Sequence, residues 1–310
     1  MPGGAPGSAA PVIVVLRSLN LGDLLVAVPA LRALRRQFPD ERVVLACGLR
    51  PAPLMAATGC VDEVLALDGL VDLPERLRGA GAVVNLHGTG PRSNQVLDAL
   101  DPVRRIGHAG HGWSGPSWLD GIHERERWCR LLDAHGIPAD PAELDLPVPD
   151  WPPAAPGAVL VHPGAGYGSK RWPADRFAAV ARVLRDRGHR VAITGSPGER
   201  ALTARVAAAS GADDLGGALE LPALAATVAA AELVICGDTG VAHLASAYRT
   251  PSVVLFGPVS TREWGPPPGP HIALSADHAR RGDPFADDPD PALLGVGAAD
   301  VLAAARDLLP

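Results

Sequence analysis

The stretch VIVVLRSLNLGDLLVAVPALRALRRQFPDERVVLAC, from Val12 to Cys47, predicts the fold of this chain. It begins with a continuous apolar run, Val12 to Leu16, which is typical of a buried strand. A polar turn follows, and apolar residues then recur at helical spacing from about Leu24 to Gln37. A second apolar run, Val43 to Ala46, completes a strand–helix–strand unit, which indicates a parallel sheet.

The same alternation continues to about residue 86 and restarts after residue 158. Between these points the prolines cluster over residues 138–158, where neither a regular helix nor a central strand can form. We therefore expect an α/β protein of two Rossmann-like, doubly wound parallel-sheet domains, residues 1–150 and 151–310, facing each other across a cleft. The last helix, residues 298–309, is a candidate to pack back on the N-terminal domain. Residues 275–292, rich in Asp and Pro, are expected to form an exposed loop.

Composition excludes several classes of protein. The 310 residues carry a net charge of -6, whereas a nucleic-acid-binding protein usually has a basic excess. The four cysteines form no CxxC pair, so neither a zinc site nor a disulfide framework is indicated. There is neither a signal peptide pattern nor an uncharged run long enough to span a membrane. We expect a cytoplasmic monomer, with peripheral association with a membrane left open.

The first candidate catalytic residue is Asp23, in the turn between the first strand and its helix. A carboxylate at that edge can take a proton from an attacking hydroxyl, and Gly22 lets the backbone and a substrate come close. The alternative is that Asp23 only caps the helix. Asn20 and Gly22 of the same turn are candidates to bind a substrate.

The second candidate site is the loop His162-Pro163-Gly164-Ala165-Gly166, which closes a strand of the second half. Glycines there leave backbone amides open to an anion, and the following Ser169 and Lys170 add a hydroxyl and a compact positive charge suited to a diphosphate. An ordinary polar loop with a solvated lysine is the alternative. The loop is not a GxGxxG motif, so a nicotinamide cofactor is not indicated.

A third group, Asp238, Thr239, Gly240 and His243, ends another strand and opens a helix. A helix N-terminus presents unpaired amides and a positive dipole end to an anion. Thr239 and Gly240 are suited to a diphosphate, Asp238 to sugar hydroxyls, and His243 to a phosphate. The alternatives are a helix cap for Asp238 or Thr239 and a core histidine for His243.

Further candidates follow other predicted strand ends. Glu199 is a candidate to bind a ligand or to cap the next helix. His87 and Arg92 lie in a polar loop after a strand and are candidates for acceptor binding. Residues 104–113, rich in Arg, His and Gly, are expected to form a flexible acceptor-binding loop, with a solvated surface as the alternative. Their histidine spacing is poor for a metal site.

Three of these segments, in this order and spacing, resemble glycosyltransferase family 9, the bacterial heptosyltransferase family. They are RSLNLGDLL (residues 17–25), HPGAG with SKRWP (residues 162–166 and 169–173), and GDTGVAHLA (residues 237–245). The resemblance implies a GT-B fold with the acceptor on the N-terminal half and the donor on the C-terminal half. It also implies an inverting transfer without a metal or other cofactor, most often from ADP-heptose to a glycan, glycolipid or small-molecule hydroxyl.

Within that resemblance, Asp23 matches the catalytic base, Lys170 the lysine on the donor phosphates, and Glu199 a glutamate near the ribose. One alternative is the same fold with a GDP- or UDP-linked donor. The other is a sugar-nucleotide-binding protein or epimerase that transfers nothing and needs no base at Asp23. Many members of the family carry cysteines late in the chain, whereas this chain has none after Cys236 and has an Asp/Pro-rich segment, residues 283–291, there instead.

Overall fold

The computed structural model describes residues 11–310, which form two compact α/β units. The N-terminal unit comprises the chain up to Asp120 together with Arg125–Glu143, and the C-terminal unit comprises Gly121–Glu124 and Leu144–Pro310. The units therefore divide near Glu143, seven residues before the boundary expected from the sequence. Part of the proline-rich stretch belongs to the C-terminal unit, because Leu144 and Leu146 are buried and the Leu146 amide donates to the Ala247 carbonyl.

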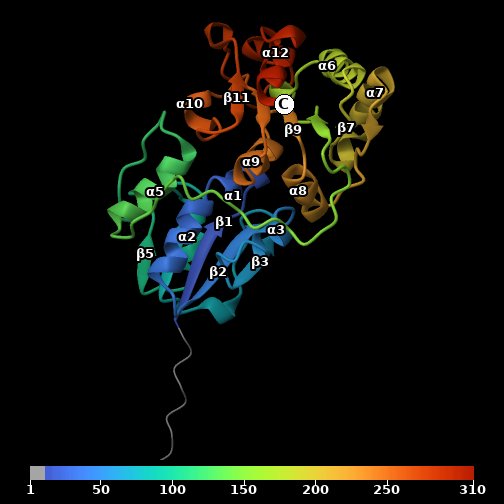
Figure 1. The fold of residues 1–310 in the computed structure, drawn as a ribbon. Helices are drawn as coiled ribbons and strands as arrows, with labels where there is room; N and C mark the ends of the chain where they lie inside the picture. Colours follow the sequence, from blue (N-terminus) through green and yellow to red (C-terminus); the bar gives the residue numbers. More distant parts are fainter. Residues whose placement is uncertain (1–10) are drawn as a thin grey trace, which may run out of the picture. The chain divides into compact units, whose positions relative to one another are not determined.

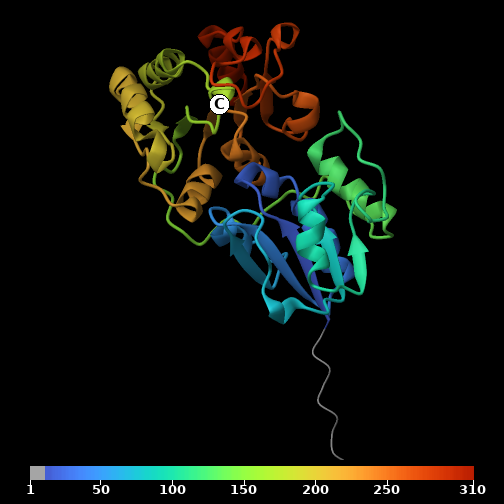
Figure 2. The ribbon, with the colours of Figure 1, turned by 180° about the vertical axis from the view of Figure 1, so that it is seen from behind.

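The N-terminal unit is built on a parallel sheet in the order β3-β2-β1-β4-β5. Its strands are β1 (Val12–Arg17), β2 (Arg42–Gly48), β3 (Glu63–Leu67), β4 (Ala82–Asn85) and β5 (Arg104–Ile106). Its helices are α1 (Leu21–Leu25), α2 (Val28–Gln37), α3 (Ala52–Ala56), η1 (Glu75–Leu77), α4 (Arg92–Asp98) and α5 (Glu124–Ala134). Helix α2 covers one face of the sheet in Figure 1, and α4 covers the opposite face in Figure 2.

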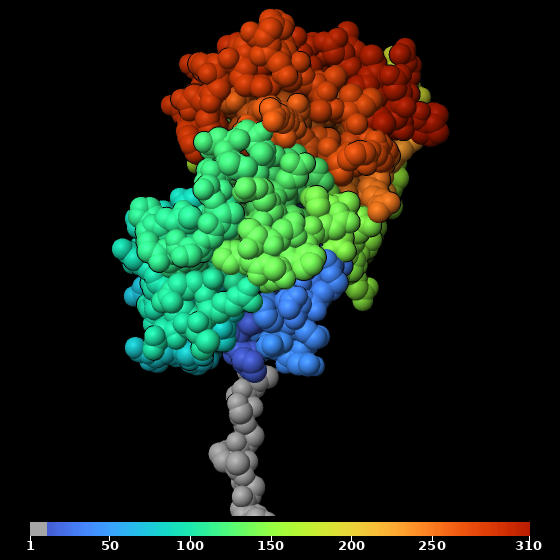
Figure 3. Space-filling model, turned by 90° about the vertical axis from the view of Figure 1, so that its left-hand side faces the viewer, coloured from blue at the N-terminus to red at the C-terminus, as the bar shows by residue number. Residues whose placement is uncertain are grey.

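The C-terminal unit repeats this plan with the order β11-β10-β9-β6-β7-β8, again all parallel. Its strands are β6 (Val159–His162), β7 (Val191–Ile193), β8 (Asp213–Asp214), β9 (Leu233–Gly237), β10 (Ser252–Leu255) and β11 (His271–Leu274). Its helices are η2 (Gly168–Lys170), α6 (Ala174–Asp186), η3 (Pro197–Glu199), α7 (Arg200–Ser210), α8 (Leu221–Ala229), α9 (Gly240–Ala247), α10 (Thr261–Trp264), η4 (Asp277–Ala279), α11 (Pro291–Leu294) and α12 (Ala298–Leu308). On the face drawn in Figure 3, the surface of this unit comes mainly from the orange-to-red end of the chain.

Both sheets have the strand order of a Rossmann fold, as the sequence predicts. In each sheet the connections turn in opposite directions at one pair of neighbouring strands, β1 with β4 in the first and β6 with β9 in the second. Ligands of such sheets bind beyond the carboxyl ends of the strands at this switch point. The order therefore marks one candidate position in each unit before any side chain is considered.

Several details differ from the sequence expectation. The first helix breaks into α1 and α2 at Val26–Ala27, because the ring of Pro29 excludes a continuous helix past the carbonyl of Leu25. The last helix, α12, packs against α6, β10 and β11, and its buried residues Val301, Ala304 and Ala305 belong to the core of the C-terminal unit. The apolar face of α12 is therefore buried within the C-terminal unit.

The two segments expected to be loops are more ordered than predicted. Residues 104–113 contain strand β5 and a tight turn in which Gly110 and Trp113 pair, and His108 and Trp113 are buried. Residues 275–292 contain η4 and the start of α11, and the carboxylate of Asp290 is fully buried. Both segments keep many exposed residues, as expected, but each is fixed by a few buried side chains.

Candidate functional site

The C-terminal unit brings several predicted residues to its switch point. In the register of β6 and β9, His162 lies opposite Cys236, so the loops carrying Lys170 and Asp238 leave neighbouring strands on the same edge. The Lys170 ammonium lies 2.7 Å from a carboxylate oxygen of Asp238. The side chain of Asp238 is 5% exposed and that of Lys170 is 22% exposed. A nearly buried carboxylate is thus balanced by a positive charge that still reaches solvent.

Thr239 precedes helix α9 and has an unsatisfied polar group. Its side chain makes no capping bond to the helix, and its hydroxyl oxygen is buried with no hydrogen-bond partner within the described part of the chain. Burial and the Asp238 charge raise the pKa of the nearby Cys236 thiol, and an interaction with the Thr239 side chain lowers it. Gly240 is the first residue of α9, so its amide belongs to the turn that lacks intrahelical acceptors. Buried donors without partners are costly, which makes this turn suited to an anionic ligand.

Glu199 lies in the loop after β7 and contacts the loop after β6. One of its carboxylate oxygens accepts bonds from the amide and the hydroxyl of Ser196, each at 2.7 Å. A Cβ atom at Gly164 would overlap the Glu199 carboxylate, so glycine is needed for this approach. The capping role left open by the sequence is therefore present, and the ribose role stays a prediction.

Other predicted donor residues lie at different depths. The Ser169 side chain is fully buried, and its hydroxyl donates to the Pro284 carbonyl at 2.8 Å, so it faces the protein interior. Gly166 is exposed, with open space around its α-carbon. His243 is half-buried on α9, and its ring meets the edge of Trp264 at 6.0 Å between centroids.

His162, at the end of β6, is held in its neutral form. Its Nδ1 lies 3.0 Å from the Thr194 hydroxyl oxygen. Burial lowers the pKa of His162, and the nearby Glu199 carboxylate offsets part of that effect. A neutral imidazole here adds no positive charge to the loop, so Lys170 supplies the cation of this group.

In the N-terminal unit, Asp23 lies in the first turn of α1, and its side chain is 27% exposed. The residue at the N-cap position is Asn20, which makes no side-chain capping bond. The suggestion that Asp23 caps the helix is therefore wrong. Its carboxylate remains open to solvent at the end of β1, on the switch-point side of the sheet.

Arg17, the last residue of β1, fixes the position of Asp23. Its guanidinium is 1% exposed, donates from Nε to the Asp23 carbonyl at 2.5 Å, and donates from Nη1 to the Leu86 carbonyl. Its Nη2 lies 3.9 Å from the Asp23 carboxylate, and the group stacks over the Trp128 ring at 4.5 Å. The sequence analysis missed this residue, although an arginine at the end of an apolar strand is itself a sign of a paired buried charge.

His87 interacts with Arg17 and Asp23, whereas Arg92 forms an ion pair with a residue outside this group. Burial and the Arg17 charge lower the pKa of His87, and the Asp23 carboxylate partly offsets them, so the three side chains interact electrostatically. The Nδ1 atom of His87 is buried without a hydrogen-bond partner among residues 11–310. Arg92 is exposed and pairs with Asp72 at 3.4 Å.

Within residues 11–310 no group of three His, Cys, Asp or Glu side chains is arranged to hold a metal ion. No helix in the same part of the chain is long and apolar enough to cross a membrane.

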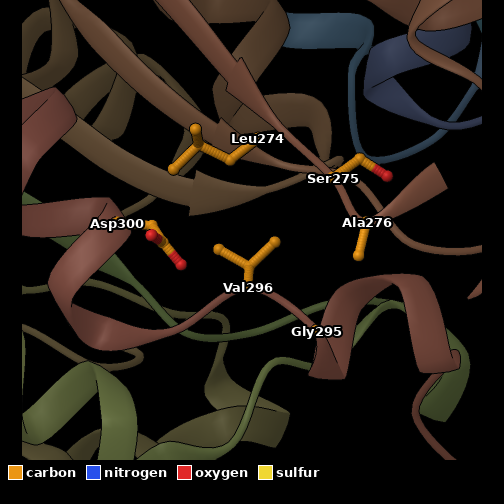
Figure 4. Close-up of a pocket in the computed structure, with 6 residues that line it drawn as sticks. All are labelled: Leu274, Ser275, Ala276, Gly295, Val296 and Asp300. Atoms are coloured by element: carbon orange, nitrogen blue, oxygen red, sulfur yellow. The ribbon is translucent and has the colours of Figure 1, made fainter. Parts of the chain in front are cut away.

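Figure 4 shows an open pocket of about 190 Å³ beside β11 and α12, lined by Leu274, Ser275, Ala276, Gly295, Val296 and Asp300. Its volume is below the roughly 300 Å³ at which ligand pockets begin, and its lining contains none of the predicted site residues.

Comparison with known proteins shows which family this chain resembles. A model described as glycosyltransferase family 9 (heptosyltransferase) matches residues 140–281, the part that carries Lys170, Glu199 and Asp238. Lipopolysaccharide heptosyltransferase 3 of Escherichia coli K12 is 26% identical over 296 residues, which cover 79% of this chain and 82% of the relative. The chain is thus similar to glycosyltransferase family 9 in its second half, and to a heptosyltransferase over most of its length.

Solved structures show the same fold for members of this family. Escherichia coli ADP-heptose lipopolysaccharide heptosyltransferase II superposes with a TM-score of 0.80 at 20% identity, covering 96% of this chain and 98% of that one. The Escherichia coli heptosyltransferase WaaC with ADP-2-deoxy-2-fluoro heptose superposes with a TM-score of 0.72 at 18% identity, covering 96% and 99%. These superpositions show that the chain has a GT-B fold. The sequence relatives support its assignment as a glycosyltransferase.

Proposed function

We propose that this glycosyltransferase moves a heptose from ADP-heptose to a hydroxyl of a glycan, glycolipid or small-molecule acceptor, with inversion and without a metal. The observation that carries the proposal is the pairing of Lys170 with Asp238 beside the buried, unpartnered hydroxyl of Thr239. A cation, a hydroxyl and a helix N-terminus at one sheet edge are the groups that a diphosphate requires. The relatives named as heptosyltransferases support heptose as the transferred sugar.

In the proposed reaction, the acceptor oxygen attacks the anomeric carbon of the donor while Asp23 takes the hydroxyl proton. The bond from that carbon to the diphosphate oxygen breaks, and ADP leaves with the bonding electrons. Lys170 and the first amides of α9 offset the negative charge that develops on the leaving oxygen. Glu199 holds the ribose, and Asp238 accepts hydrogen bonds from the sugar hydroxyls.

Asn20, Gly22, His87 and Arg92 are assigned to acceptor binding in the same proposal. Attack from the face opposite the leaving group inverts the anomeric configuration. The cytoplasmic location, the monomeric state and the absence of a metal remain predictions from the sequence.

A thermal-shift screen with ADP, GDP and UDP, each with and without EDTA, tests the donor assignment. A ligand present at a hundredfold its dissociation constant stabilises a protein by about 2.7 kcal/mol. We expect ADP to raise the melting temperature and EDTA to leave that shift unchanged. A shift with GDP or UDP instead would favour another nucleotide-sugar donor, and a strict need for magnesium would contradict the proposed chemistry.

A further inference from the structure

The segment from Arg281 to Asp290, here called the acidic segment, lies between η4 and α11 in the C-terminal unit. It contains Asp283, Asp287, Asp288 and Asp290, and the sequence assigned it no role. Three of these carboxylates are exposed, whereas Asp290 is 0% exposed. Asp290 is therefore the one carboxylate of this segment that lies inside the fold.

The acidic segment binds every polar group of Ser169. The Ser169 amide donates to the Ala286 carbonyl at 2.8 Å, and its hydroxyl donates to the Pro284 carbonyl at 2.8 Å. The Ser169 carbonyl accepts from the Asp290 amide at 3.0 Å. The residue is fully buried by these contacts, and the next residue in the chain is Lys170. The backbone next to Lys170 is therefore fixed by hydrogen bonds to the acidic segment, which is distant in the sequence.

Two packing contacts join the same pair of segments. A Cβ atom at Gly168 would overlap the Asp287 carbonyl oxygen, so the two backbones cross in direct contact. The rings of Tyr167 and Phe285 meet edge to face, with centroids 5.0 Å apart. Residues 167, 168 and 169 are thus each covered by the acidic segment.

Asp290 holds the acidic segment in this shape. Its carboxylate accepts from the backbone amides of Arg281 at 3.2 Å, Gly282 at 3.1 Å and Ala292 at 2.9 Å. These bonds join the first residues of the segment to the start of α11. A buried carboxylate that loses such amide donors carries a large desolvation penalty, so the arrangement depends on the charge.

We propose that Asp290 is a positioning residue for Lys170, acting through the acidic segment and Ser169. The role in diphosphate binding rests on the proposed function of Lys170. A lysine side chain is flexible and carries a single point charge. A fixed backbone at its base reduces the conformational entropy that the side chain loses when it binds a ligand. The Asp238 carboxylate then holds the far end of the side chain at 2.7 Å.

The test is the affinity for ADP, measured by isothermal titration calorimetry, in Asp290→Asn and in the matched variant Asp288→Asn. The asparagine amide would point an N–H group at a backbone N–H, so we expect Asp290→Asn to weaken ADP binding about tenfold. Asp288 is exposed on the same segment, and its substitution makes the same change in charge, so that variant should bind ADP as the wild type does.

A double-mutant cycle with Lys170→Met separates positioning from a general loss of stability. If Asp290 acts through Lys170, Asp290→Asn should cost little further affinity once the lysine is absent. An equal loss of affinity in both backgrounds would overturn the proposal. So would an Asp290→Asn variant that binds ADP as tightly as the wild type.

Amide hydrogen exchange gives a readout that needs no ligand. We expect faster exchange at Ser169 in both Asp290→Asn and Ser169→Ala, with the strands of the sheet still protected. Unchanged protection of the Ser169 amide in Asp290→Asn would contradict the proposal that Asp290 fixes the backbone next to Lys170. A wild-type protein that binds no ADP would instead contradict the proposed function, while the exchange result would still decide the structural claim.

Discussion

At the scale of single residues, Thr239 makes the most specific prediction. Its hydroxyl is buried without a hydrogen-bond partner in the described chain, so Thr239→Val removes a group that costs free energy in the unliganded protein. We expect the melting temperature to stay the same or to rise. ADP binding should weaken about tenfold, because a hydrogen bond to a charged group contributes about 1.5 kcal/mol or more.

The matched control for this prediction is Thr250→Val. The Thr250 side chain is also buried, but its hydroxyl donates to the Val228 carbonyl at 3.0 Å. This variant should lose about 1–3 kcal/mol of unfolding free energy and retain its affinity for ADP. A Thr239→Val protein with the opposite pattern, less stable and unchanged in ADP binding, would show that the Thr239 hydroxyl is structural.

Asp23 carries the second prediction at this scale. Asp23→Asn keeps the shape of the side chain and its place in the first turn of α1, but it removes the base. We expect the variant to fold normally and kcat/KM to fall by about 10²–10⁴, the usual contribution of general base catalysis. The exposed Asp68 of the same unit provides the control, and Asp68→Asn should transfer sugar at the wild-type rate. Near-normal transfer by Asp23→Asn would exclude this carboxylate from the mechanism.

At the scale of elements, the loops after β6 and β7 act together, because Gly164 and Glu199 approach too closely for any side chain at residue 164. Gly164→Ala would push the Glu199 carboxylate away while leaving Ser196 in place. We expect the KM for the nucleotide-sugar donor to rise severalfold with little change in kcat, since ribose contacts bind substrate and transition state alike. Gly198→Ala adds a methyl group where the nearest other atom is 4.0 Å away and should leave KM unchanged. Equal KM values for the two variants would contradict the ribose role of Glu199.

The sequence predicted the elements of both sheets well, because continuous apolar runs and the alternation of strand and helix are local signals. It failed where long-range packing decides the structure. The turn at Gly110 and Trp113 is ordered by distant contacts, including a bond from the Trp113 indole to the Asp98 carboxylate at 3.1 Å. The acidic segment has the composition of an exposed loop, and only the fold places the Asp290 carboxylate against three amides.

The sequence also predicted only part of the candidate site. Asp23, Lys170 and Asp238 lie in the loops or turns that follow predicted strands, so their place near the carboxyl edge of a sheet follows from the topology. Arg17 and Trp128 were not assigned, because the cation–π contact between them joins residues 111 positions apart and leaves no local pattern. The inward direction of the Ser169 hydroxyl could not be predicted either, because its acceptor, the Pro284 carbonyl, lies far away in the sequence.

At the scale of the whole molecule, three histidines make stability depend on pH. Burial lowers the pKa of His87, His162 and His271 below the ordinary value of 6.5. Below pH 6.5 the unfolded chain therefore binds protons that the folded protein does not, and the unfolding free energy decreases as the pH falls. Above that pH both states are neutral at these residues, so their contribution is constant.

We expect the unfolding free energy, measured by urea denaturation, to be level from pH 8 to pH 7 and to fall between pH 6.5 and pH 5. Each histidine that remains neutral in the folded state contributes a slope of up to about 1.4 kcal/mol per pH unit. His162→Gln removes one such group and should reduce the slope. A slope unchanged by this substitution would show that His162 takes up its proton equally in both states.

The most direct test of the account is a crystal structure of the protein with ADP, grown in the presence of EDTA. The account predicts the diphosphate within hydrogen-bond distance of the Lys170 ammonium, the Thr239 hydroxyl and the Gly240 amide, with no ion between them. A diphosphate bound elsewhere on the C-terminal unit, or ADP that enters the crystal only when magnesium bridges its phosphates, would contradict it.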